Sequence, residues 1–351
     1  MFNFYKQSAS LEVQAIFAQE LAVMLKSGLT LMEALEVLDE QASGRLKKTI
    51  QKIKALVVAG NQFSQALDKA GGIFSSVFIS TIKAGEQSGT LEKNLSNIAQ
   101  QLAKQKNLAD KIKSVMVYPI IILSASILFG LGITYWILPK VLNVLQGLKV
   151  ELPLSTRILL GFANLMERHG GLVALGIGGA VILGILLWHS RAGQPFVHWL
   201  LLRLPLIRSM VVYTNIVILA RTLATLLQSG LSAAESVATT ADALSNYYFR
   251  RNLRKVYSRV RGGEGLADSL AQENWLPALV VKMVGVGERT GRLEEVLFDL
   301  ADHYEAKLDG VVKRLSAAIE PLLLLLMGLL VGFLAISIIT PIFQVTSNIY
   351  K

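Results

Sequence analysis

The chain repeats itself, and the two copies share one offset: the residue numbers of four landmarks all differ by 202. A fixed offset of this kind is the signature of a tandem duplication. Each copy is a polar segment followed by an apolar one, so the fold of the first copy predicts the fold of the second. The landmarks are the blocks Gly85–Glu92 and Gly287–Glu294, the tripeptides Ser27–Leu29 and Ser229–Leu231, and the proline pairs Pro119/Pro321 and Pro139/Pro341.

Three long stretches of the sequence contain no charged residue: 114–139, 169–190 and 321–350. A helix needs about 20 apolar residues to cross a bilayer, and each stretch reaches that length. The sequence therefore predicts three transmembrane helices, at 114–139, 170–190 and 320–343. A shorter apolar stretch, between Arg208 and Arg221, predicts a buried helix of a soluble domain instead.

The middle span has no counterpart in the repeat, because its image would fall beyond the last residue. It returns the chain to its original side of the membrane, so both polar segments face the same compartment. Lysines and arginines gather beside the spans, which predicts a cytoplasmic location for both segments and for the N-terminus and lets them meet anionic lipid. The expected order is a cytoplasmic helical domain at 1–113, an outer loop at 140–169, a second cytoplasmic domain at 191–319 and an outer tail at 344–351.

Each polar segment is predicted to be a bundle of about six helices, since its apolar residues recur at helical spacing. The chain is therefore expected to be an all-α polytopic membrane protein with two homologous cytoplasmic bundles. Gly28, after Ser27, is placed to end a helix in the left-handed conformation. Thr30 and Glu33 then form a capping box for the next helix. Ser229, Gly230, Ser232 and Glu235 repeat this arrangement in the second copy.

The prolines near the starts of two of the apolar stretches are also interpreted as structural. Pro119 and Pro321 are expected in the first turns of their spans, where a missing backbone N–H costs little.

The repeated Gly-Glu block supplies the candidate functional residues, and two interpretations of it stay open. In the first it is a helix–turn–helix elbow, with Ser88 and Thr290 capping the helices that follow. In the second it is a contact surface for a partner, because a turn does not require Glu86 or Glu288. The candidate residues are Gly85, Glu86, Gly89, Leu91, Glu92, Gly287, Glu288, Gly291, Leu293 and Glu294.

The sequence offers no recognisable catalytic, cofactor or metal site. It lacks a Walker-type phosphate loop, an HExxH pair and a Gly-x-Ser-x-Gly elbow, it has no cysteine, and its four histidines are scattered. The net charge of +10 does not indicate nucleic-acid binding, because the cations are mixed with acids or lie at the membrane junctions. A scaffold is favoured over an enzyme, and a small permease that uses the repeat as a transport path is the alternative.

The paired Ser-Gly-Leu elbows, the two Gly-Glu-x-x-Gly-x-Leu-Glu blocks, and the pairs Tyr118-Pro119 and Glu320-Pro321 together resemble the type II secretion system protein F family. This family includes the inner-membrane platform proteins of type IV pilus assembly. The resemblance extends from about Leu11 to the C-terminus. Many members carry a further segment before the first helical domain, whereas this sequence starts almost at that domain, and this departure puts the contacts made by that segment in doubt.

The resemblance implies a non-enzymatic platform of the bacterial inner membrane, with the chain assembled as a homo-oligomer. The implied partners are a cytoplasmic secretion or pilus ATPase, pilin or pseudopilin subunits and other inner-membrane assembly proteins. The platform would couple the ATPase to polymerisation of the pilin or pseudopilin. The sequence leaves open whether the product is a pilus or a secretion pseudopilus, and which bundle meets the ATPase.

Overall fold

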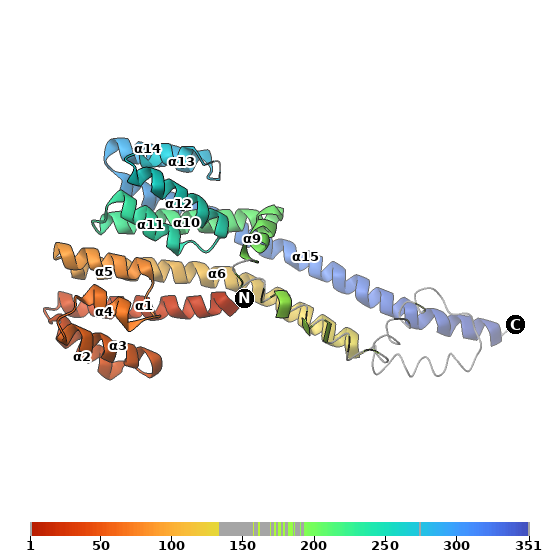
Figure 1. Ribbon diagram of the computed structural model, residues 1–351. Coiled ribbons are helices and arrows are strands. Elements are labelled where there is room, and N and C mark those ends of the chain that lie inside the picture. Colours follow the sequence, from red (N-terminus) through yellow and green to blue (C-terminus); the bar gives the residue numbers. More distant parts are fainter. Residues whose placement is uncertain are drawn as a thin grey trace. The chain divides into compact units, whose positions relative to one another are not determined.

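The computed structural model describes residues 2–132, 193–273 and 275–349, together with isolated residues between 157 and 190. Every regular element within these ranges is a helix, which confirms the predicted all-α class (Figure 1). The first copy contains α1 (Phe2–Lys26), α2 (Leu31–Gln41), α3 (Gly44–Val58), α4 (Phe63–Ala70), α5 (Ser76–Ser88) and α6 (Leu91–Gly132). The second contains α10 (Pro205–Gln228), α11 (Ala233–Ala243), α12 (Tyr247–Arg261), α13 (Leu266–Ala271), α14 (Ala278–Thr290) and α15 (Leu293–Ile349), preceded by α9 (Gln194–Arg203).

The duplication holds helix by helix, with one local shift. Helices α2, α5 and α6 begin 202 residues before α11, α14 and α15, whereas α3 and α4 begin 203 residues before α12 and α13. The loop after α2 has two residues (42–43) and the loop after α11 has three (244–246), which adds the extra residue. The segment 266–277 is one residue shorter than its counterpart 63–75, so the original offset returns before the Gly-Glu blocks.

The predicted glycine stops are Schellman motifs in both copies. At the end of α1, Gly28 has φ +89°, its N–H donates to the Leu25 carbonyl, and the Leu29 N–H donates to the Met24 carbonyl. This pair of bonds satisfies carbonyls that the end of a helix leaves open. Gly230 (φ +91°) ends α10 with the same two bonds. The capping box at Thr30 is also present, with hydrogen bonds in both directions between Thr30 and Glu33.

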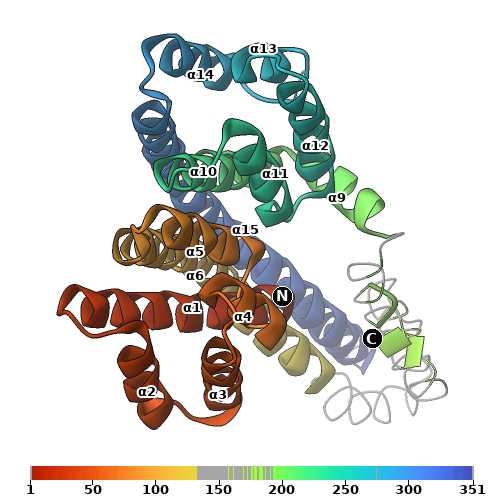
Figure 2. The same cartoon turned by 60° about the vertical axis from the view of Figure 1, so that its left-hand side comes forward.

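Two hydrophobic cores lie in one compact unit, made of residues 1–113 and 198–312. We call the 1–113 part the first bundle and the 198–312 part the second bundle. The bundles interlock: Leu226 of α10 belongs to the core of the first bundle, and Leu108 of α6 belongs to the core of the second. Helix α5 also contacts α10 and α11, as Figure 2 shows.

Three described helices are long and apolar enough to cross a membrane. Two of them, Leu91–Gly130 and Leu293–Ser337, are parts of α6 and α15, and their most apolar 18-residue stretches are only 7% and 6% buried inside the protein. They overlap the predicted first span at 114–130 and the predicted third span at 320–337. Residues 133–139 of the predicted first span lie outside the described residues. The third is Ile207–Gln228 within α10, whose most apolar 18-residue stretch is 61% buried, because this helix belongs to the core of the second bundle. This agrees with the buried helix that the sequence predicts there. Most of the predicted second span, 170–190, lies outside the described residues.

The second compact unit is made of residues 114–197 and 313–351. Its described side chains are mainly exposed and apolar, including Ile127, Leu128, Leu325 and Leu329. Ser126 is an exception: only 4% of it is exposed, and its hydroxyl lies 2.6 Å from both the Ile122 carbonyl oxygen and the Met327 sulfur. Helices α6 and α15 therefore contact each other within this unit.

The expected position of the two prolines is wrong. Pro119 lies in the interior of α6 and Pro321 in the interior of α15, so neither is in the first turn of a helix. The prediction assumed that each span begins as a separate helix. Instead each helix begins at a Gly-Glu elbow and continues through the proline. Proline removes one backbone hydrogen bond from a helix interior, which membrane helices tolerate when other groups satisfy the freed carbonyl.

Candidate functional site

The repeated blocks form the elbows between α5 and α6 and between α14 and α15. Gly89 ends α5 with φ +71° and Gly291 ends α14 with φ +68°. A side chain is strained in this left-handed region, so each turn favours glycine. The two elbows therefore have the same geometry, as the repeat predicts.

The first glycine of each block permits a close contact between two helices. A Cβ atom added at Gly85 would lie 2.9 Å from the Asn94 side-chain nitrogen and 3.0 Å from the Leu91 Cα. At Gly287 it would lie 3.0 Å from the Leu293 Cα. Both glycines are buried. Gly85 and Gly287 are therefore packing residues that let α6 and α15 begin directly against the preceding helix.

The glutamate of each block binds the N-terminus of another helix. The Glu86 carboxylate accepts hydrogen bonds from the Phe63 N–H (2.6 Å), the Ser64 N–H (3.1 Å) and the Ser64 hydroxyl (2.6 Å) at the start of α4. Glu288 accepts hydrogen bonds from the Leu266 N–H (2.7 Å) and the Ala267 N–H (2.9 Å) at the start of α13.

These two carboxylates replace the caps that α4 and α13 lack. Neither Gln62 nor Gly265, the residues at the N-cap positions, makes a side-chain capping bond. The first N–H groups of a helix need acceptors, and a negative charge there is favoured by the helix dipole. Glu86 and Glu288 thus have a structural role that the sequence interpretation missed.

The remaining polar residues of the blocks are placed differently. Glu92 is exposed in the first turn of α6, and Glu294 is half-buried in the first turn of α15. The expected capping by Ser88 and Thr290 is wrong, because these residues are the last of the preceding helices. Their hydroxyls donate back to the carbonyls of Ala84 and Val286, and a hydroxyl bonded to its own helix does not cap the next one.

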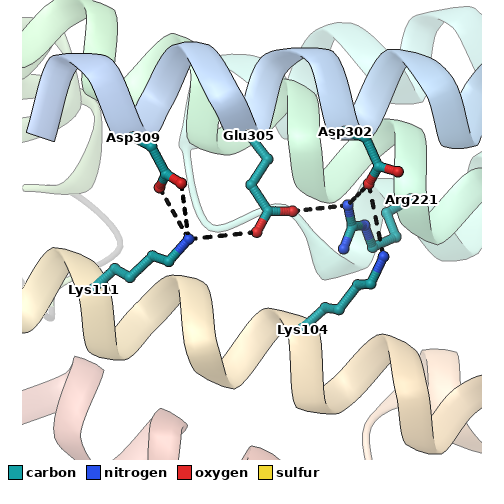
Figure 3. Close-up of polar contacts among 6 residues, drawn as sticks. All are labelled: Lys104, Lys111, Arg221, Asp302, Glu305 and Asp309. Atoms are coloured by element: carbon teal, nitrogen blue, oxygen red, sulfur yellow. Dashed lines mark hydrogen bonds and ion pairs between the residues drawn. The ribbon is translucent and has the colours of Figure 1, made fainter.

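A cluster of charges joins the two bundles on the helices that follow the elbows (Figure 3). Arg221 of α10 donates to Asp302 (2.5 Å) and Glu305 (2.8 Å) of α15. Two lysines of α6 reach the same row of acids from the first bundle. Lys104 lies 3.7 Å from Asp302, and Lys111 lies 3.8 Å from Glu305 and 3.0 Å from Asp309.

The members of this charge cluster differ in burial, and this decides their energetic roles. The Arg221 side chain is 4% exposed, while the Asp302 side chain is 63% exposed and that of Lys104 is 54% exposed. An exposed ion pair contributes little to stability, but a buried charge without its partners is costly. Arg221 is therefore the member that depends on the cluster.

Neutral hydrogen bonds continue this contact between the bundles. The Asn94 amide donates to the Thr81 carbonyl of its own bundle (3.2 Å) and to the Ser229 carbonyl of the other (3.3 Å). The Gln101 amide donates to the Thr222 hydroxyl (2.9 Å). Asn94 and Gln101 are both buried. Ser229, predicted only as part of a helix stop, thus also accepts a bond from the first bundle.

In the structure, residues of the first elbow lie next to residues that join the two bundles, although these groups are far apart in the sequence. The first elbow adjoins the contact between the bundles through Asn94, which packs on Gly85 and bonds to Ser229. The charge cluster was missed, because the positions 202 residues before Arg221, Asp302 and Glu305 are Gln19, Gln100 and Ala103. A comparison of the two repeats detects only residues that both copies share, and these charged residues occur in the second copy alone.

One histidine links α9 to the second bundle. The His198 Nδ1 accepts a hydrogen bond from the Tyr247 N–H at the start of α12 (3.0 Å). Burial, and then the nearby charge of Arg250, hold the pKa of His198 below its ordinary value. The ring is therefore kept neutral, as an acceptor requires. Within the described ranges, His, Asp and Glu residues form no group that could hold a metal ion.

These features define a class of protein: a membrane protein in which two interlocked helical bundles carry long apolar helices. The family model "Type II secretion system (T2SS), protein F" matches residues 17–139 and again residues 219–341. The chain belongs to this family. The double match also confirms the duplication.

Relatives of known name extend over nearly the whole chain. The type IV pilus assembly protein PilC of Thermus thermophilus is 33% identical over 95% of this chain and 83% of its own length. The type II secretion system protein F of Aeromonas hydrophila is 29% identical over 99% of this chain and 90% of its own length. That of Xanthomonas campestris is 31% identical over 95% and 82%. Together with the apolar helices, these relatives fit an inner-membrane protein.

Proposed function

We propose that this chain is a non-enzymatic inner-membrane platform of type IV pilus assembly or type II secretion. It couples a cytoplasmic assembly ATPase to the polymerisation of pilin or pseudopilin subunits. Two relatives, named as a type IV pilus assembly protein and as a type II secretion system protein F, support both settings. Other inner-membrane assembly proteins and further copies of the chain complete the proposed assembly.

One observation carries this proposal: each of α6 and α15 begins at a Gly-Glu elbow and runs unbroken into an apolar segment. Between elbow and apolar segment, the charge cluster and the Gln101–Thr222 bond tie α6 to the second bundle. A load applied to one bundle is therefore shared by both helices. A machine that transmits conformational work into a membrane needs this kind of connection.

The proposed topology places both bundles in the cytoplasm, residues 140–169 outside, and the N-terminus in the cytoplasm. The absence of cysteine allows single labelling sites to test it. Ser43 and Ser245 are exposed in the loops before α3 and α12, so Ser43→Cys and Ser245→Cys are suitable probes. We expect an impermeant maleimide to label Leu145→Cys in intact cells and to label the two loop variants only after lysis. Labelling of the loop variants in intact cells would contradict the topology.

Among the candidate residues for contact with a partner, the two elbow glutamates are less suitable for a test than Glu92. The carboxylates of Glu86 and Glu288 hold helix N-termini, so changing them alters the fold as well as any surface. Glu92 is exposed and is the better residue with which to test contact. We expect Glu92→Lys to weaken binding of the assembly ATPase while the protein stays folded. Unchanged binding would remove Glu92 from the proposed interface.

The coupling itself is tested with the full chain in nanodiscs and the assembly ATPase of the same organism. Binding with an altered rate of ATP hydrolysis is the expected result. The matched variant is Asp302→Asn with Glu305→Gln, which removes the negative charges that partner Arg221 without touching the elbows. It should retain ATPase binding and lose the effect on hydrolysis. If the wild-type chain neither binds the ATPase nor changes its rate, the coupling proposal is wrong.

A further inference from the structure

Helix α9 presents a row of apolar side chains to its surroundings. Phe196 is 62% exposed, Trp199 40%, Leu200 45% and Leu204 42%. Phe196, Trp199 and Leu200, at i, i+3 and i+4, share one face of α9, and Leu204 follows the helix directly, where the chain bends into α10. Exposed apolar patches on a folded protein mark contact sites for proteins, ligands or membranes.

The opposite face of α9 is attached to the second bundle. His198 accepts the hydrogen bond from Tyr247, and Leu202 packs against the core of that bundle. These two residues lie one turn apart, so they fix the rotation of the helix about its axis. The apolar row is therefore held facing away from the bundle.

The charged residues that flank this row in the sequence are positive. Arg203 lies over the Trp199 ring, with its guanidinium carbon 4.3 Å from the ring centre, and Arg208 is exposed one turn into α10. The sequence contains no Asp or Glu between Glu167 and Glu235. Tryptophan beside arginine suits the boundary between acyl chains and headgroups, because each side chain has an apolar part and a polar end.

The position of α9 in the chain points to the same surroundings. The helix begins four residues after the charge-free stretch that ends at Ser190. A second copy of the chain is a poor occupant of this face, because it would bring Arg203 and Arg208 against their own counterparts. Anionic headgroups complement those charges.

We propose that α9 is an interfacial anchor: its Phe196–Trp199–Leu200 face, together with Leu204 directly after the helix, lies in the headgroup region of a bilayer containing anionic lipid. Helices of this type bind with their apolar face at the acyl boundary and their cations among the headgroups. The anchor fixes the second bundle to the membrane surface. This role is independent of the proposed ATPase coupling.

The test uses the full chain, in which a single introduced cysteine can carry a nitroxide spin label. Leu200→Cys reports on the apolar face in nanodiscs that contain phosphatidylglycerol. Ser258→Cys on α12 serves as an exposed control outside the row, and Leu329→Cys on α15 as a reference in an apolar segment. The collision rates of the label with oxygen, which dissolves in lipid, and with a water-soluble nickel complex are compared.

We expect the oxygen-to-nickel ratio for Leu200→Cys to be shifted from that of Ser258→Cys toward that of Leu329→Cys. A ratio equal to that of Ser258→Cys would overturn the proposal. An immobile label that neither reagent reaches would do so too, since it would show contact with protein, including a second copy. Adding Arg203→Gln and Arg208→Gln should lower the ratio in discs with phosphatidylglycerol. If it does not, anionic lipid is not the partner.

Discussion

Replacing Glu86 by alanine is expected to open helix α4 without unfolding the protein. The substitution removes the acceptor of three hydrogen bonds at the start of α4. Loss of a helix cap costs about 1 kcal/mol, and a hydrogen bond to a charged group contributes about 1.5–3 kcal/mol. Phe63 and Ser64 are 1% and 2% exposed, so water replaces the lost acceptor poorly. We therefore expect a loss of about 3 kcal/mol.

Hydrogen exchange of the full chain in nanodiscs measures this change where it occurs. A loss of about 3 kcal/mol corresponds to roughly a 150-fold increase in the opening equilibrium of α4. Glu288→Ala should act less strongly on α13, by about 2 kcal/mol, because Glu288 accepts two bonds and is more exposed.

The matched control for Glu86→Ala is Glu92→Ala in the same block. Glu92 is exposed in the first turn of α6, so its removal should leave α4 unchanged. Unaltered exchange of α4 in Glu86→Ala would refute the capping role of this carboxylate. Equal acceleration in both variants would show that the effect belongs to the elbow as a whole.

Three further predictions concern the contacts between elements. Removing both acids with Asp302→Asn and Glu305→Gln should lower the free energy of unfolding by about 3 kcal/mol, whereas Arg221→Met should cost far less, because only the arginine is a buried charge; equal losses in chemical denaturation would contradict this. Gly85→Ala should cost about 1–3 kcal/mol from overpacking, with Gly130→Ala, which has open space around it, unaffected in the same experiment. The hydrogen bond from Tyr247 to His198 should be fully present above the ordinary pKa of 6.5 and be lost only as the pH falls through the lowered pKa of the folded state, since the protonated ring cannot accept; a protection factor of the Tyr247 amide that stays constant across this pH range would contradict this.

The sequence predicted those features that depend on neighbouring residues or on the repeat. The glycine stops at Gly28 and Gly230, the capping box at Thr30 and the all-α class follow from local rules. The equivalence of the two elbows follows from the shared offset. The prolines were misplaced because periodicity does not show whether a polar helix and an apolar one are continuous.

Contacts between distant residues were not accessible in the same way. The bonds from Glu86 to α4 cross more than 20 residues, and no local pattern encodes them. A weak signal was nevertheless available: Gln62 and Gly265 provide no side-chain cap for α4 and α13, and each copy has a glutamate in its Gly-Glu block further on. The charge cluster offered no such signal, since Arg221 corresponds to Gln19 in the first copy.

The two copies of the repeat, the two halves of the chain, carry different charges where they meet, and this affects how they recognise each other. In a symmetric dimer every contact residue occurs on both sides, so an attractive pair must be built twice. Here the lysines come from α6 of the first half and the acids from α15 of the second. The two halves therefore carry opposite charges at their contact, and neither half could take the place of the other. In a protein assembled from two copies of the first half, the α6 lysines would meet Gln100 and Ala103 in place of Asp302 and Glu305. The ion pairs that orient the two halves would then be lost.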